Sequence, residues 1–344
     1  MSTSEIDTAL SDLAESVFRD ARGDGEPGTG FDAALWSTLD EAGLARLTLP
    51  ADAGGSEATF ADAAVVLGAA GAHAARVPLV ETDLLAGWLL HTAGIALPAG
   101  PLTLATGDLD IDRTVNRASG VLHRVPWARA AAGIVMLAGD HVLLFDPADV
   151  AITDGTNVAE EPRDTVTVDG AIIASSVDEQ VGAELRLRAA LGRSLLLAGA
   201  ARGALAAAVH YAGERVQFGR AIGKFQAVQQ DLARAAAEVA AASAAAESAA
   251  RAATQHGFAA PESRFAIAAA KSRTGEAAGV VARIAHQVHG AIGFTREHDL
   301  RLTTTRLWAW RDEDGTEAEW NELIGGLVLE GGADQLWPLI TGSP

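Results

Sequence analysis

The spacing of hydrophobic residues is helical at the start of the chain. Apolar residues there recur three or four positions apart, as on the stripe formed by Leu10, Leu13 and Val17. The helices predicted from this spacing cover residues 4–22, 32–42, 59–72 and 79–93. A turn-rich stretch at 48–55 separates the second helix from the third. We therefore expect an N-terminal helical domain over residues 1–98.

The pattern then changes to brief runs of strand-forming residues with turn residues between them. The predicted strands cover residues 102–105, 120–125, 132–138, 141–145, 150–153 and 165–168. Gly139-Asp140 and Asp169-Gly170 are typical of the turns between such strands. This series indicates a small, β-barrel-like middle domain over residues 99–178.

Helical spacing returns near residue 179 and continues to the end of the chain. The predicted helices cover residues 182–214, 222–256, 262–291, 298–311 and 315–342. Alanine dominates 235–254, and such small side chains favour close packing of helices. We expect a C-terminal four-helix bundle over 179–344, and so a fold that is mainly α with a central β domain.

Charge and composition exclude several classes of function. The formal net charge is −19, which disfavours nucleic acid as a partner because phosphate binding needs clustered Lys and Arg. The chain has no cysteine, so disulfides, thiolate catalysis and Cys-based metal sites are excluded. The N-terminus does not resemble a signal peptide, and the most apolar stretch is broken by Arg202 and His210. We expect a cytoplasmic protein with no membrane span.

A glycine pattern at 23–28 matches a dinucleotide-binding fingerprint by spacing alone. The segment GDGEPG fits G-x-G-x-x-G, but no predicted strand precedes it. Asp24 and Glu26 would also repel a pyrophosphate. We interpret residues 23–30 as a linker.

The joint between the first two bundle helices has the composition of an anion site. The segment ERVQFGRAIGKFQ predicts a helix end near Gly219 and a helix start near Gly223. Arg215 offers a guanidinium fork and the helix start offers backbone amides, a combination that suits pyrophosphate. Phe218 and Phe225 could flank a ring. The alternative is an ordinary helical hairpin with an exposed arginine and core phenylalanines.

A second segment, QVHGAIGFTRE, begins at Gln287. Gly290 and Gly293 lie where a helix should end, and small residues there let a backbone or a ligand approach closely. His286 and His289 are three residues apart and could bind a metal, but no third ligand is near. We therefore expect no metal site and interpret both as surface or capping histidines.

Together, these two segments resemble the signatures of the acyl-CoA dehydrogenase family. RVQFGRAIGKFQAVQ resembles R-x-x-F-G-x-x-I-x-x-F-Q-x-x-Q, and QVHGAIGFTRE resembles Q-x-H-G-G-x-G-[YF]-T-x-E, in the same order along the chain. The stretch LWSTLDEAGLARLTLPADAGG is similar to the opening helical domain of that family. The resemblance extends over nearly the full chain and implies an FAD-dependent oxidoreductase that dehydrogenates an acyl-CoA thioester.

The resemblance also implies positions that contact FAD. These are Arg215, Gln217, Phe218, Phe225, Gln226, Gln287, Gly290 and Ala291. The first two would contact the pyrophosphate and ribityl region, the next three the adenosine or diphosphate, and the last three the adenosine end. Ala291 stands where the signature has its second glycine. In the family these groups reach a flavin bound mainly to a neighbouring subunit, so the resemblance implies a subunit interface.

One departure from the family pattern lies in the β domain. The family has a T-E-P-G-A-G-S-D-like loop that holds the flavin and the acyl thioester, but none follows the strand segment PLTLATGDLD. The family also has a tryptophan–threonine pair beside the flavin, and Trp127 in VPWA is the nearest counterpart. The resemblance therefore implies a trimmed middle domain in which Trp127 lies near the cofactor.

The other departure concerns the catalytic base. α,β-Dehydrogenation needs a carboxylate to take a proton from the α-carbon while a hydride leaves the β-carbon for the flavin. The usual family position falls on Asp314, with Glu313 beside it, and a second known position falls near Ala189, which cannot act. Asp314 is one methylene shorter than the usual glutamate. The alternative is an exposed acidic turn, with Thr316 as the N-cap and Glu319 completing a capping box.

Both departures indicate a branch of the family from actinobacterial steroid catabolism. That branch forms α2β2 heterotetramers of a complete and a degenerate chain, and RLWAWR resembles one of its segments. The resemblance implies a degenerate subunit that completes the FAD site of a second acyl-CoA dehydrogenase-like chain. The expected substrate is a bulky acyl-CoA, such as that of a steroid side chain, which would place the chain in lipid metabolism. A separate protein would accept the electrons. The alternatives are a self-sufficient homo-oligomer using Asp314 as base, and a structural subunit without flavin.

Overall fold

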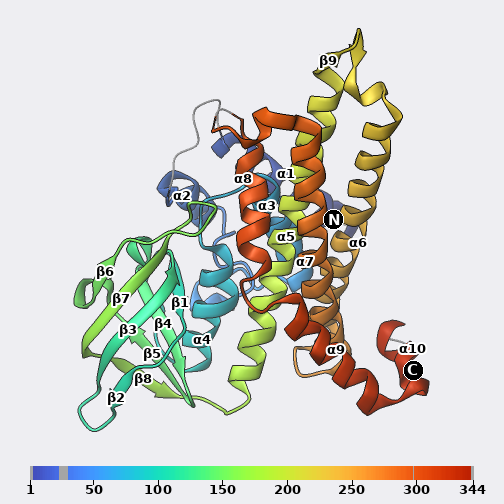
Figure 1. The fold of residues 1–344 in the computed structure, drawn as a ribbon. Helices are drawn as coiled ribbons and strands as arrows, with labels where there is room; N and C mark the ends of the chain where they lie inside the picture. Colours follow the sequence, from blue (N-terminus) through green and yellow to red (C-terminus); the bar gives the residue numbers. More distant parts are fainter. Residues whose placement is uncertain (1–2, 23–29, 297, 342–344) are drawn as a thin grey trace. The chain divides into compact units, whose positions relative to one another are not determined.

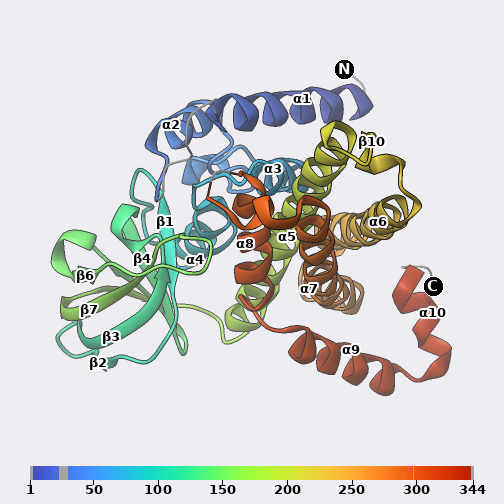
Figure 2. The ribbon, with the colours of Figure 1, turned by 45° about the horizontal axis from the view of Figure 1, so that its top comes forward.

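The computed structural model describes residues 3–22, 30–296 and 298–341 (Figures 1 and 2). Most of the predicted linker at 23–30, including its glycine pattern, lies outside the described residues. The chain forms two compact units, which are described separately. The first unit comprises Met1–Phe18, Phe60–Ala75 and Ala190–Pro344, and the second comprises Arg19–Thr59 and Arg76–Ala189. The division into three consecutive domains stays a prediction.

The first unit is built from helices. They are α1 (Thr3–Arg22), α3 (Phe60–Ala72), α5 (Val181–Glu214), α6 (Gln226–His256), α7 (Pro261–His289), α8 (Leu300–Arg311), α9 (Glu317–Gly331) and α10 (Ala333–Thr341). α5 begins within the second unit, and α1 ends there. Figure 2 shows α5, α7 and α8 close together with α6 beside α7. Buried residues of these four helices share one apolar core, in which Val281, Leu307 and Trp310 take part. The predicted helical bundle is confirmed, and the alanines of α6 such as Ala242 and Ala246 are buried in it, as expected.

Glycine lets α3 and α5 approach each other closely. A Cβ at Gly71 would lie 2.3 Å from the carbonyl oxygen of Leu196, and one at Gly199 would lie 2.1 Å from that of Gly68. Neither distance leaves room for a side chain, so the backbones touch at this crossing. Close packing against α3 also explains why α5 is so apolar. It is the one described helix long and apolar enough to cross a membrane, half of its most apolar stretch is buried, and core helices of soluble proteins pass the same test.

The joint after α5 differs from the prediction. α5 ends at Glu214, before the predicted Gly219, and a two-stranded hairpin follows: β9 (Val216–Gln217) and β10 (Arg220–Ala221). Phe218 and Gly219 form its turn at φ values of +52° and +79°, which glycine supplies easily and which tight hairpin turns require. A short 3₁₀ turn, η5 (Ile222–Lys224), leads into α6. Figure 1 shows the hairpin projecting beyond the ends of α5 and α6.

Glycine ends two other helices of the first unit. α7 ends at His289 with Gly290 as its cap at φ +65°, which confirms the predicted helix end, and the 3₁₀ turn η6 (Gly290–Phe294) follows. The predicted single helix over 315–342 is wrong, because Gly332 at φ +73° separates α9 from α10. A residue in that conformation cannot continue an α-helix.

The second unit combines short helices with two sheets. Its helical elements are α2 (Ala33–Glu41), η1 (Ala51–Ala53), the π-helix η2 (Val80–Gly87), α4 (Trp88–Thr92), and the 3₁₀ turns η3 (Ala128–Ala130) and η4 (Pro147–Asp149). Its strands are β1 (Leu102–Ala105), β2 (Asp110–Asp112), β3 (Arg117–Pro126), β4 (Gly133–Ala138), β5 (His141–Phe145), β6 (Ala151–Thr153), β7 (Arg163–Ala171) and β8 (Ile173–Ser176). The sheet orders are β1-β4-β5-β8 and β2-β3-β7-β6, and only the β1–β4 pair is parallel.

The two sheets share an apolar core. Leu122 and Val166 from one sheet meet Ile134 and Phe145 from the other. All six predicted strands are present, while β2 and β8 were missed. The segment 101–110 is not one strand, since β1 and β2 belong to different sheets and only four residues connect them.

The helix predicted over 79–93 is present, but its first half is the π-helix η2. Hydrophobic spacing does not distinguish this winding from an α-helix over so short a segment. The Thr82 hydroxyl of η2 is buried and pairs with both backbone groups of Leu102, donating to its oxygen over 3.1 Å and accepting from its nitrogen over 2.9 Å. These bonds attach η2 to the first strand of its sheet.

Candidate functional site

The two signature segments meet at one end of the helical bundle. The ring of Tyr211, near the end of α5, stacks on the ring of His289 at the end of α7, with centroids 4.4 Å apart. The Arg215 amide donates to the Tyr211 carbonyl over 2.9 Å, so Arg215 follows one turn beyond this contact. Residues about seventy positions apart in the sequence are thereby brought to one surface.

The hairpin presents most of the first signature to solvent. Arg215, Gln217 and Gln226 are exposed, and Phe218 is 92% exposed. Phe225 is held differently, because the guanidinium of Arg220 lies 4.2 Å over its ring and the edge of Phe218 meets it at 6.1 Å. The alternative prediction that both phenylalanines lie in the core is therefore partly right for Phe225, which is half-buried, and wrong for Phe218.

The end of α7 presents the second signature. Gln287, Gly290 and Ala291 are exposed. A Cβ at Gly290 would meet no atom within 4 Å, so the backbone there is open to an approaching group. Gly293 has another role, because a Cβ there would lie 2.9 Å from the Cβ of His289. The space at Gly290 is open, whereas Gly293 is required by internal packing.

His286 and His289 are buried, so their assignment as surface residues is wrong, but both lie in the last turn of α7, where the Nδ1 of His289 pairs with the Ala285 carbonyl over 2.8 Å. His286 lies between the rings of Phe294 at 4.3 Å and Trp308 at 5.2 Å, and its Nε2 pairs with the Thr304 hydroxyl over 3.0 Å. The Nδ1 of His286 is buried without a hydrogen-bond partner. Burial lowers the pKa of His286 and of His289, which favours neutral rings.

A helical period would have placed these histidines correctly. Ala278, Val281, Ala282 and Ala285 form the buried stripe of α7, and both histidines continue it by one turn. Within the part of the chain that the structure describes, no group of three or more His, Cys, Asp or Glu residues could hold a metal ion. His286 instead connects η6 to α8 through ring stacking, and His289 connects the end of α7 to α5 through Tyr211.

The two candidate bases lie in the loop between α8 and α9 and are bound to a buried arginine. Arg193 of α5 donates from Nε to the Asp314 carboxylate over 2.8 Å, and its Nη2 lies 3.4 Å from the Glu313 carboxylate. The side chains of Asp314 and Glu313 are only 23% and 16% exposed. The alternative prediction, an exposed acidic turn, is therefore wrong for Glu313 and Asp314, because both side chains are largely buried.

The helix cap after this loop was predicted correctly, whereas the buried lysine that supports the loop was not. Thr316 is the N-cap of α9 and forms the predicted capping box, with the Thr316 amide donating to the Glu319 carboxylate over 2.7 Å. Lys271 is fully buried and its Nζ donates to the carbonyls of Arg311 over 2.9 Å and Gly315 over 2.7 Å. Burial lowers the pKa of Lys271 to about 8. Sequence reasoning missed both Arg193 and Lys271, which are polar residues inside apolar helical stretches.

Trp127 belongs to the second unit and follows β3. It is buried, adopts φ +54°, and its amide donates to the Pro162 carbonyl over 3.2 Å. The next turn is fixed by Arg129, whose guanidinium pairs with buried Asp164 and with Asp154. The backbone at Trp127 is thus firmly held, and its place beside a flavin stays a prediction.

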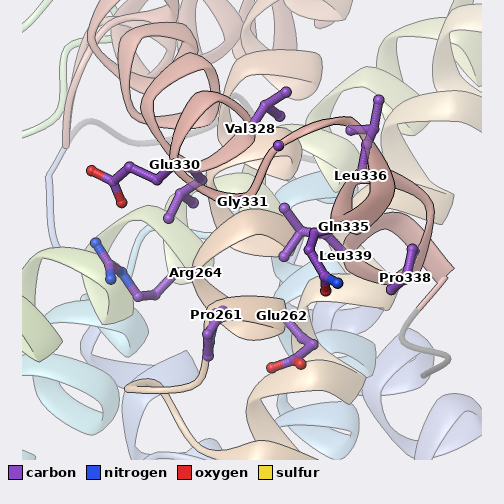
Figure 3. A pocket seen from close by; sticks show the side chains of 12 residues that line it. Pro261, Glu262, Arg264, Val328, Glu330, Gly331, Gln335, Leu336, Pro338 and Leu339 are labelled. Carbon is purple, nitrogen blue, oxygen red and sulfur yellow. The ribbon is translucent and has the colours of Figure 1, made fainter.

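A groove of about 610 Å³ lies between the start of α7 and the helices α9 and α10 (Figure 3). Arg264 and Glu330 lie on one side of it and Leu336 and Pro338 on the other. None of the predicted site residues lines it. Most of the predicted FAD contacts are exposed, namely Arg215, Gln217, Phe218, Gln226, Gln287, Gly290 and Ala291, whereas Trp127 is buried, and their contact with a flavin stays a prediction.

Comparisons with known proteins agree with this architecture. Residues 187–319 match the family profile described as "Acyl-CoA dehydrogenase, C-terminal domain". The chain is 32% identical to acyl-CoA dehydrogenase IpdE2 of Mycolicibacterium smegmatis over 285 residues, which cover 79% of this chain and 81% of that protein. The corresponding IpdE2 of Mycobacterium tuberculosis is also 32% identical and is covered to 80%.

Solved structures share the fold along nearly the whole chain. A chain of the ChsE4-ChsE5 complex from Mycobacterium tuberculosis matches with a TM-score of 0.84 at 23% identity, over 96% of this chain and 99% of that one. A chain of a variant of the Tcur3481-Tcur3483 steroid ACAD matches with a TM-score of 0.82 at 25% identity, over the same shares.

Proposed function

Because the chain belongs to the acyl-CoA dehydrogenase family, we propose that it is a subunit of an FAD-dependent acyl-CoA dehydrogenase and completes the FAD site of a neighbouring chain. The observation that carries this proposal is the exposed end of the bundle. There, Arg215 follows α5, Gln287 and Gly290 lie at the end of α7, and all three are exposed where Tyr211 stacks on His289.

The residues at this end fit a dinucleotide. Arg215 forms no ion pair with any of the described residues, so its guanidinium is available to a phosphate. The open backbone at Gly290 lets a ribose or a base approach, and the Gln287 amide can donate and accept hydrogen bonds. Phe218 supplies apolar area for a ring.

The chemistry is divided between the cofactor and this chain. FAD would accept the hydride that leaves the β-carbon of the acyl thioester. This chain's residues would bind the phosphates at Arg215 and orient the adenosine end at Gln287. The stacked rings of His289 and Tyr211 hold these two segments in register.

A neighbouring chain is needed to cover this surface. Four large apolar side chains are exposed around it: Val216 at 60%, Phe218 at 92%, Ile292 at 41% and Phe294 at 70%. Apolar residues gathered in this way mark an interface. The ChsE4-ChsE5 complex and the two-part name of the steroid ACAD support a partner of the same fold, and hence an α2β2 heterotetramer.

The proposal extends to the role and the substrate. The chain would be the degenerate partner, since the loop between β1 and β2 is only four residues long and the usual glutamate is missing. A bulky acyl-CoA of the steroid side-chain type is supported by the steroid ACAD among the structural relatives. A separate protein would accept the electrons.

The test is co-expression with a neighbouring dehydrogenase-like reading frame, followed by measurement of flavin per tetramer. We expect two flavins for every four chains, and we expect Arg215→Gln to weaken flavin binding about tenfold or more, since it removes a charged hydrogen bond. Arg251→Gln is the matched control, because Arg251 is an exposed arginine near the end of α6 that lies away from the hairpin. This variant should bind flavin normally. Four flavins per tetramer would indicate a self-sufficient homo-oligomer, and a colourless protein with every partner would exclude a flavin role.

A further inference from the structure

The loop at 312–315 is held at both ends and in its middle. Lys271 binds the carbonyls of Arg311 and Gly315, on either side of the loop. The indole of Trp320 donates from Nε1 to the Asp314 carbonyl over 3.0 Å. Asp314 itself adopts φ +59°, a conformation that a non-glycine residue keeps only when its surroundings enforce it.

There is also no space for the loop to shift toward the bundle. A Cβ at Gly315 would lie 2.5 Å from the Nε1 of Trp320, so indole and backbone are already in contact. An aspartate that replaces a glutamate as base needs a backbone shift to recover the missing methylene. The contacts of Lys271 and Trp320 oppose such a shift.

The carboxylates of this loop have a committed partner. Arg193 is buried and places its guanidinium against both Asp314 and Glu313. A carboxylate that removes a proton from carbon must be free to face the acyl chain, whereas both of these carboxylates face a buried guanidinium. Turning Asp314 away would leave the buried Arg193 with a weaker counter-charge.

We propose that Arg193 holds Asp314 and Glu313 as ion-pair anchors of the α8–α9 loop, so that neither carboxylate removes a proton from an acyl-CoA. This inference rests on the proposed function, because it assigns proton removal in the assembled enzyme to the partner chain. In this chain the loop joins α5, α7 and α9 instead of performing chemistry. Arg193, Lys271 and Trp320 each contribute one of these connections.

The deciding experiment compares Asp314→Asn with Asp312→Asn in the co-expressed complex. Asp312 is the matched control because it lies in the same loop with a side chain 70% exposed. We expect Asp314→Asn to lower the Tm by about 2–6 °C, as for breaking a partly buried ion pair, while turnover stays within about twofold and flavin stays bound. Asp312→Asn should change none of the three quantities. A fall in turnover of about a hundredfold or more with flavin bound, whatever the Tm, would show that Asp314 is the base and overturn the inference.

A double-mutant cycle with Arg193→Gln tests the pair without any turnover. We expect the double variant Arg193→Gln/Asp314→Asn to lose clearly less Tm than the sum of the single losses, because each single change already breaks the pair. Strict additivity would contradict the anchor role. Since the cycle uses the chain alone and requires no flavin, it still decides the inference if the complex takes up no cofactor and the proposed function fails.

Discussion

The buried histidines show how a few polar residues shape the candidate site. Neither His286 nor His289 was expected inside the protein, yet the first ring connects η6 to α8 and the second connects the end of α7 to α5. Each has one ring nitrogen without a hydrogen-bond partner. Burial lowers the pKa of both histidines, which favours their neutral rings. Charging either ring would place an unpaired cation in an apolar stack, so the site depends on pH through these two residues.

We predict that the contribution of these two histidines to the free energy of unfolding falls as pH decreases below about 6.5, the usual pKa of histidine. Burial lowers the pKa of both rings in the folded state, so the unfolded chain binds more protons just below that pH. The loss continues until pH passes the folded pKa and then levels off. Urea midpoints at pH 7.5 and 5.5 should show a smaller difference for His289→Phe, which keeps the stacking on Tyr211 but cannot be charged. An equal difference in the variant and the parent chain would contradict the assignment.

The elements were predicted well where one physical signal determined them. The six strands and the helices of the bundle follow from hydrophobic period, and Gly290 ends α7 as its position indicated. The β9–β10 hairpin was missed because Phe218, a non-glycine residue, adopts positive φ in its turn. The π-helix η2 has the same apolar spacing as an α-helix, so its winding could not be predicted. The ion pair between Arg193 and Asp314 joins residues 121 positions apart, which no local pattern reveals.

The π-helix carries a prediction of its own through Asp83. Its carboxylate accepts from the Thr48 amide over 3.0 and 3.2 Å, and burial raises its pKa to about 7, with Arg188 acting in the opposite direction. Because the folded pKa lies above the unfolded value of 3.8, the contribution to stability is full below 3.8 and is lost as pH rises toward 7. We expect Asp83→Asn to keep one bond to Thr48 and to gain stability relative to the parent chain by on the order of 4 kcal/mol between pH 4 and pH 8.

Thermal unfolding at several pH values checks the effect of Asp83→Asn. Asp52→Asn is the control, since Asp52 is an exposed carboxylate in η1 of the same unit. Its stability should follow that of the parent chain at every pH. If Asp83→Asn and Asp52→Asn behave alike, the carboxylate of Asp83 titrates as an ordinary exposed group, and the burial argument fails.

At the scale of the whole molecule, charge and apolar surface act against each other. A net charge of −19 makes two copies of this chain repel each other, while the exposed residues around Phe218 favour association. Salt screens the repulsion over a Debye length of about 10 Å at 0.1 M and leaves the apolar attraction in place. A less acidic partner chain would reduce the repulsion, which favours an unlike pair over a pair of identical chains.

This balance predicts how association responds to Phe218→Ser. An exposed aromatic residue at the tip of a projecting hairpin is a natural anchor, and its loss should weaken binding of the partner chain by about tenfold or more, measured by sedimentation or calorimetry. Val158→Ser is the matched control, because Val158 is 63% exposed in the other unit and should leave the affinity unchanged. Raising the salt concentration should increase self-association of the parent chain and have little effect on the Phe218→Ser variant. If Phe218→Ser binds its partner as tightly as the parent chain does, the hairpin is not at the subunit interface, and the shared FAD site must be placed elsewhere.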